Sequence, residues 1–136
     1  MEPSESKTRK RILIAEDEQM LRETLVEVLT EAGYDVIATA DGAEARDKAL
    51  ELKPDLLLLD IQMPLLSGLE ALKMIRGTEW GATVPVVLLT NMGDVRNISG
   101  AIDLQAHDYL IKADISLDKV IETIHRKLNP DPRTSA

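Results

Sequence analysis

Residues 55–68 read DLLLLDIQMPLLSG, and four consecutive leucines in this stretch end at an aspartate. A run this short suits a β-strand, and a strand without apolar/polar alternation is covered on both faces, which is typical of a parallel sheet between helices. The proline and glycine that follow indicate a turn or loop. The stretch therefore predicts a doubly covered strand with Asp60 at its carboxyl end.

Short apolar runs and amphipathic segments alternate along the rest of the chain. The apolar runs predict strands at 11–15, 35–39, 55–59, 85–89 and 108–111. Apolar side chains at spacings of three and four predict helices at about 21–32, 41–53, 65–76, 94–104 and 117–128. Because crossovers between parallel strands are right-handed, this order predicts an α/β fold with a doubly wound, five-stranded parallel sheet and helices on both faces.

The composition restricts the classes of function. The chain has 136 residues, 44% of them hydrophobic, and 24 acidic against 16 basic side chains give a net charge of −8. This acidic balance argues against direct binding of nucleic acid. The absence of cysteine excludes disulfides, thiolate metal sites and cysteine catalysis. Apolar runs such as Leu56–Leu59 are far shorter than the ~18 residues of a membrane span, so we expect a cytoplasmic protein without a membrane anchor.

The two ends of the chain differ from its middle. Residues 1–8 and 130–136 are polar and contain proline, and we expect them to be disordered tails around one domain at 9–129. No sequence for an attached output domain follows the last predicted helix, so we expect a stand-alone domain.

Charged and polar residues follow four of the predicted strands. Glu16 and Asp17 follow the first, Asp60 the third, Thr90 the fourth and Lys112 the fifth. The carboxyl ends of parallel strands meet at one edge of a sheet, where such folds bind ligands. Carboxylates that converge there repel one another, and a hard divalent cation with oxygen ligands, such as Mg²⁺, relieves the repulsion. Taken singly, each acid is better explained as a helix N-cap and the lysine as a solvated side chain, but their joint occurrence at one edge favours a functional site.

Four segments at these positions resemble a known family. They are Asp60-Ile61-Gln62-Met63-Pro64-Leu65-Leu66-Ser67-Gly68, Ala15-Glu16-Asp17-Glu18, Leu88-Leu89-Thr90 and Asp108-Tyr109-Leu110-Ile111-Lys112. Together they resemble the receiver domain of two-component response regulators over nearly all of residues 10–128. The resemblance implies a flavodoxin-like sheet with strand order 2-1-3-4-5.

The resemblance also implies roles for individual residues. Asp60 would accept a phosphoryl group from a phosphohistidine on a sensor histidine kinase or phosphotransfer protein. Asp17, Asp60 and the backbone carbonyl of Gln62 would ligate Mg²⁺, and Glu16 would hold a metal-bound water. Lys112 and the hydroxyl of Thr90 would neutralise charge on the transferred group.

The implied output is a change of surface, not the turnover of a substrate. After phosphorylation Thr90 would move toward the new group and Tyr109 would rotate inward, which changes the surface formed by residues 94–104, 108–111 and 117–128. The domain would then regulate an unidentified partner protein as a monomer or weak dimer, and would not be an enzyme in the usual sense.

Departures from the family pattern leave two other functions open. Ala113 stands where receiver domains usually have a proline, which predicts a trans peptide bond after Lys112 and a differently shaped loop. A decayed site of this kind would suit an unphosphorylated, receiver-like adaptor. The other alternative is a Mg²⁺-dependent aspartyl-phosphate phosphatase, but Gln62 stands where such enzymes carry their general acid. Gln105 in place of glycine predicts that the helix at 94–104 ends without a left-handed residue.

Overall fold

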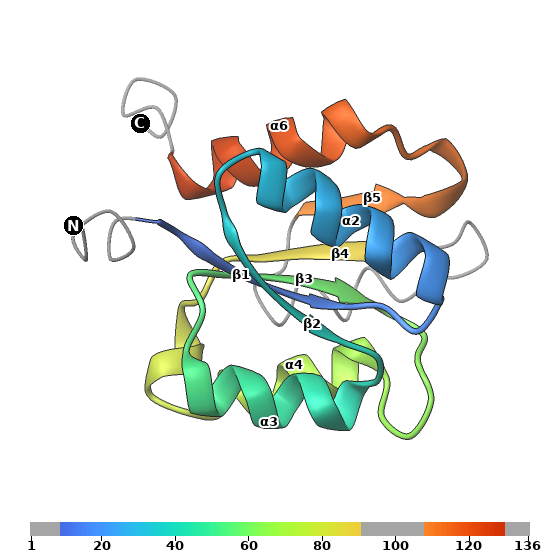
Figure 1. The fold of residues 1–136 in the computed structure, drawn as a ribbon. Coiled ribbons are helices and arrows are strands. Elements are labelled where there is room, and N and C mark those ends of the chain that lie inside the picture. The colour runs from blue at the N-terminus through green and yellow to red at the C-terminus, as the bar shows by residue number, and fades with distance from the viewer. Residues whose placement is uncertain (1–8, 91–107, 130–136) are drawn as a thin grey trace.

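The structure, a computed structural model, describes residues 9–90 and 108–129 and contains one five-stranded sheet (Figure 1). All neighbouring strands are parallel, and their order is β2-β1-β3-β4-β5. The strands are β1 Arg11–Ala15, β2 Asp35–Thr39, β3 Leu56–Asp60, β4 Val86–Thr90 and β5 Asp108–Ile111. The predicted fold class and strand order are confirmed, and the predicted strands agree with the structure except that β3 and β4 each lie one residue later than predicted.

Helices cover both faces of the sheet. Helices α2 (Gln19–Glu31) and α6 (Leu117–Leu128) lie on one face, and α3 (Gly42–Leu52) and α4 (Gly68–Arg76) lie on the other (Figure 1). Two short 3-10 turns complete the described elements, at Trp80–Ala82 and Lys112–Asp114. The predicted helix at 94–104 and Gln105 lie outside the described residues. Among the described helices, none is long and apolar enough to cross a membrane.

The central strands are buried throughout, which explains their lack of alternation. All five residues of β3 and all five of β4 are buried. Within β3, Leu57 and Leu59 belong to the core cluster on the α3 and α4 side, whereas Leu56 and Leu58 belong to the cluster on the α2 and α6 side. Each face of the strand is therefore apolar because each face meets its own layer of helices.

Helix α4 begins three residues later than the sequence predicts. Leu65 has a φ of 70°, in the left-handed region, so the backbone there does not continue a right-handed helix. Ser67 is the N-cap, and it forms a capping box in which its side chain accepts from the backbone of Glu70 and the Glu70 carboxylate accepts from the backbone of Ser67. Residues 61–67 therefore form a loop at the carboxyl end of β3.

A glycine allows this loop to pack closely over the end of β3. The backbone N–H of Gly68 donates to the carbonyl oxygen of Ile61 at 2.8 Å. A Cβ atom at position 68 would collide with the carbonyl oxygen of Asp60, so only glycine fits without a shift of the backbone. The start of α4 is thus packed directly against the residue that ends β3.

Candidate functional site

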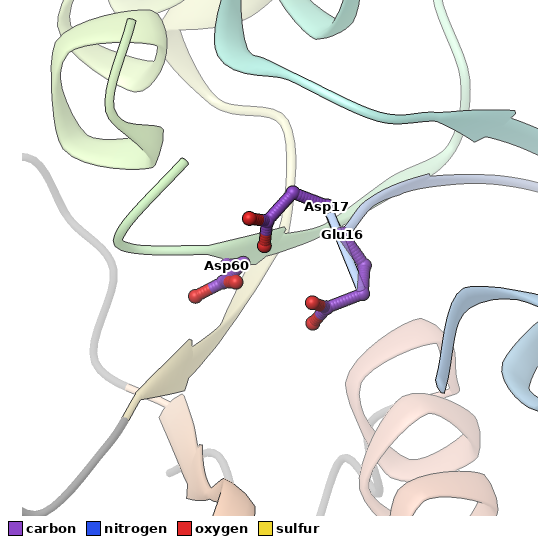
Figure 2. Close-up of side chains that lie close together, drawn as sticks. All are labelled: Glu16, Asp17 and Asp60. Atoms are coloured by element: carbon purple, nitrogen blue, oxygen red, sulfur yellow. The ribbon is translucent and has the colours of Figure 1, made fainter. Parts of the chain in front are cut away.

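Three carboxylates meet at the carboxyl edge of the sheet, as predicted. Glu16 and Asp17 follow β1, and Asp60 is the last residue of its neighbour β3. One oxygen from each of the three lies within 4.8 Å of the others, and Figure 2 shows the side chains close together at these strand ends. Glu16 and Asp60 are buried, and Asp17 is exposed.

Lys112 is the cation of this cluster. Its Nζ donates to Oδ2 of Asp60 at 2.8 Å and to Oε2 of Glu16 at 3.0 Å, and its side chain is 16% exposed. The peptide bond after Lys112 is trans, as predicted for Ala113, and residues 112–114 form a 3-10 turn. Ala113 in place of proline therefore leaves Lys112 in direct contact with both buried carboxylates.

The charges of the cluster do not balance. Burial, assisted by the charge of Glu16, raises the pKa of Asp60 to about 6, while the hydrogen bond and charge of Lys112 and the backbone N–H of Gln62 act in the opposite direction. Burial alone would lower the pKa of Lys112, but its hydrogen bonds to Asp60 and Glu16 outweigh burial, and the pKa is raised. Within the described residues, one ammonium group thus serves two buried carboxylates and leaves excess negative charge.

The two carboxylate oxygens of Glu16 differ in their hydrogen bonds, and one of them could bind a cation. Oε2 accepts from the backbone N–H of Glu18 at 3.0 Å and from Lys112. Oε1 lies 3.0 Å from Nζ in the ion pair but accepts no hydrogen bond from the described part of the chain, although it is buried. A buried, incompletely satisfied carboxylate oxygen beside two further carboxylates matches the oxygen donors that Mg²⁺ takes. The residues present therefore fit such a cation.

The remaining predicted site residues lie on the loop after β3 and on strands β4 and β5. The backbone N–H of Gln62 donates to Oδ1 of Asp60 at 3.2 Å. Gln62 and Asp17 also line an open hollow of about 450 Å³. Thr90 is buried at the end of β4, one position beyond the residue that pairs with Asp60. Tyr109 lies on β5 and is 43% exposed.

The sequence did not single out one residue that contacts this site. Nη1 of Arg22, on α2, donates to the backbone carbonyl of Glu16 at 2.9 Å. An arginine near the start of an amphipathic helix is common on solvent-facing surfaces, so its sequence position gives no separate signal.

Comparisons with known proteins agree with this geometry. The model of the response regulator receiver domain family matches residues 12–125. The chemotaxis protein CheY of Bacillus subtilis is 35% identical over 120 residues, which cover 88% of this chain and 98% of that protein. The chain spans less than half the length of several other curated relatives that it matches. One is a protein-glutamate methylesterase/protein-glutamine glutaminase of Archaeoglobus fulgidus, 37% identical over 131 residues that cover 92% of this chain and 37% of the relative.

A solved structure of similar fold contains a metal ion in its active-site cleft. The receiver domain of a sensor histidine kinase from Pseudomonas aeruginosa superposes with a TM-score of 0.80 at 27% identity and covers 89% of this chain and 98% of that one. Its structure contains a magnesium ion coordinated in the active-site cleft of that protein. The family match over 114 consecutive positions, 12 to 125, and the shared fold lead to one conclusion. The chain belongs to the response regulator receiver domain family of two-component systems.

Proposed function

We propose that this chain is a phosphorylation-dependent signalling switch in which Asp60 accepts a phosphoryl group from a phosphohistidine of a partner kinase or phosphotransfer protein. The observation that carries the proposal is the position of Asp60, whose Oδ2 lies 2.8 Å from Nζ of Lys112 in a pocket shared with two further carboxylates. Such an arrangement aligns a nucleophile and supplies compensating charge, which is what phosphoryl transfer requires.

Asp60 is suited to act as the nucleophile at neutral pH. With a pKa of about 6, the side-chain carboxyl group of Asp60 is ionised in most molecules at about pH 7. An oxygen of Asp60 forms the new bond to phosphorus as the bond from phosphorus to the histidine nitrogen breaks, and that nitrogen leaves with its electron pair. The product on this chain is an acyl phosphate. The ammonium of Lys112, already beside Asp60, pairs with the oxygens of the transferred group.

We assign the cation site to Asp17, Asp60 and the backbone carbonyl of Gln62, with Glu16 holding a water of the cation. Bound Mg²⁺ supplies positive charge that offsets the negative charge of the phosphoryl oxygens and of the three carboxylates. The hollow lined by Asp17 and Gln62 lies beside the site, and we infer that a donor approaches Asp60 from this side.

We assign the response to Thr90 and Tyr109. Thr90 is the last residue of β4, which pairs with β3, the strand that ends at Asp60. A short movement would therefore bring the Thr90 hydroxyl to the phosphoryl group. Tyr109 is on the adjacent strand β5, paired in register with Leu88 of β4, and is 43% exposed, and we infer that its ring rotates inward into the space that Thr90 vacates. This change would alter the surface that a downstream protein reads.

Intact-mass spectrometry tests the proposal directly. The chain is incubated with acetyl phosphate and Mg²⁺, and wild type is compared with Asp60→Asn and with the matched surface variant Asp47→Asn, whose side chain is 69% exposed. Wild type and Asp47→Asn should each gain the mass of one phosphoryl group, and Asp60→Asn should gain none. No gain in wild type would instead support the unphosphorylated adaptor, and sustained hydrolysis of unrelated phosphate esters would support the phosphatase.

A further inference from the structure

The peptide group between Glu16 and Asp17 is held by a residue that the proposed chemistry does not use. Arg22, near the start of α2, donates from Nη1 to the carbonyl oxygen of Glu16 at 2.9 Å. Its backbone N–H donates to the carbonyl of Glu18, also at 2.9 Å, and closes the first turn of the helix. Glu18 is the N-cap of α2 but makes no side-chain cap hydrogen bond. Arg22 therefore anchors the loop at 16–18 to the helix through both its backbone and its side chain.

The two carboxylates that follow β1 are restrained very differently. The backbone N–H of Glu16 donates to the carbonyl oxygen of Thr39 at 3.1 Å. The Glu16 carboxylate accepts from Nζ of Lys112 and from the backbone N–H of Glu18. Asp17 is exposed, and its carboxylate makes no hydrogen bond or ion pair with the residues at 9–90 and 108–129. The direction of the Asp17 carboxylate thus depends on the backbone that carries it.

We propose that Arg22 is a positioning residue for the cation site. A peptide group is planar, so a hydrogen bond that fixes the carbonyl oxygen of Glu16 also fixes the nitrogen of Asp17 and the plane between them. Rotation of that plane would swing the Asp17 side chain relative to Asp60 and Glu16. The inference rests on the proposed function, because it assumes that the three carboxylates bind a divalent cation.

The charge of Arg22 and its positioning role have opposite effects on cation affinity. The guanidinium is positive and close to the site, so its charge alone repels Mg²⁺, and removal of that charge alone would tighten binding. Loss of positioning would weaken binding, because residues that orient metal ligands typically contribute about 10- to 100-fold to affinity. The sign of the change therefore separates the two effects.

Calorimetric titration of the full chain with MgCl₂ tests the proposal. Arg22→Met keeps the apolar stem and removes the hydrogen bond, and we expect it to weaken Mg²⁺ binding by about 10-fold or more. Arg22→Lys keeps a donor and should recover part of the loss. Arg46→Ala is the charge-matched control, because Arg46 lies on α3 and its side chain contacts Asp47 and Met74, which are not part of the loop at 16–18. It should change the affinity by less than about 2-fold, since its charge is screened.

A second readout uses the cation-free chain. Amide NMR shifts of Asp17 and Glu18 should move in Arg22→Met and not in Arg46→Ala, and urea denaturation verifies that both variants are folded. If Arg22→Met does not fold, the Mg²⁺ affinity of Arg22→Lys is compared with that of wild type to test the positioning role. An Arg22 variant that is folded and binds Mg²⁺ as tightly as wild type, or more tightly, overturns the positioning role alone. Wild type that binds no Mg²⁺ overturns the cation site itself, and the positioning role with it.

Discussion

Replacement of Asp60 by asparagine should stabilise the cation-free protein at neutral pH. The folded state raises the pKa of Asp60 from 3.8 to about 6, so it holds the proton more tightly than the unfolded chain does. The contribution of protonated Asp60 to the free energy of unfolding is fully present below about pH 4 and is lost as the pH rises through about 6. At about 1.4 kcal/mol per pKa unit, ionisation of Asp60 costs the folded protein about 3 kcal/mol at pH 7.

Asparagine removes most of this cost and keeps most of the packing. Its amide has nearly the same volume, and its oxygen still accepts the Gln62 N–H that Oδ1 accepts now. It loses the ion pair with Lys112, which remains bound to Glu16. We therefore expect Asp60→Asn to be about 1–3 kcal/mol more stable than wild type at pH 7 without divalent cations.

Urea denaturation with EDTA, at several pH values between about 4.5 and 7.5, measures this difference. The advantage of Asp60→Asn should shrink steadily as the pH falls through 6, because wild type regains its proton. The surface variant Asp47→Asn should stay within about 0.5 kcal/mol of wild type throughout. A folded Asp60→Asn that is less stable than wild type at pH 7, or whose advantage is the same at pH 7 and pH 4.5, would refute this electrostatic account.

Three further substitutions test the parts that hold the site. Lys112→Met should lower the unfolding free energy by roughly 2–4 kcal/mol at pH 7 in EDTA, because two buried carboxylates lose their cation, and should raise the pKa of Asp60 measured by NMR. Ser67→Ala should cost about 1 kcal/mol in urea denaturation through loss of the capping box; no loss would contradict the cap. Gly68→Ala should lower the free energy of unfolding by more than about 2 kcal/mol, because the added Cβ meets the carbonyl oxygen of Asp60. The control is Gly77→Ala, where φ is −77° and no atom of the described residues beyond its chain neighbours lies closer than 3.4 Å to the added Cβ. This control variant should be as stable as wild type or more stable. Equal stability of the two alanine variants would contradict the packing argument.

The sheet was predictable from the sequence, but the start of α4 was not. Four leucines without alternation require cover on both faces, and that requirement holds whatever the details of packing. Leu65 and Leu66 continue the apolar spacing of the helix toward its N-terminus, so periodicity alone extends the helix into the loop. The left-handed backbone at Leu65 depends on how the loop packs over β3 and carries no glycine signal.

The convergence of the site was predictable, but its internal bonds were not. Residues that follow parallel strands must meet at one edge of the sheet, so the order of strands is enough to bring Glu16, Asp60 and Lys112 together. The hydrogen bonds from Lys112 to two carboxylates and from Arg22 to a backbone carbonyl depend on side-chain conformations, which spacing along the chain does not determine.

The central claim is that Asp60 accepts a phosphoryl group with the help of a divalent cation, and identification of the modified residue tests it most directly. After reaction with acetyl phosphate, borohydride reduction converts an aspartyl phosphate to homoserine, which peptide mass spectrometry then locates. We predict homoserine at position 60 in samples with Mg²⁺ and none in samples with EDTA. Homoserine at Asp17 instead, or at no position in the presence of Mg²⁺, would contradict the claim.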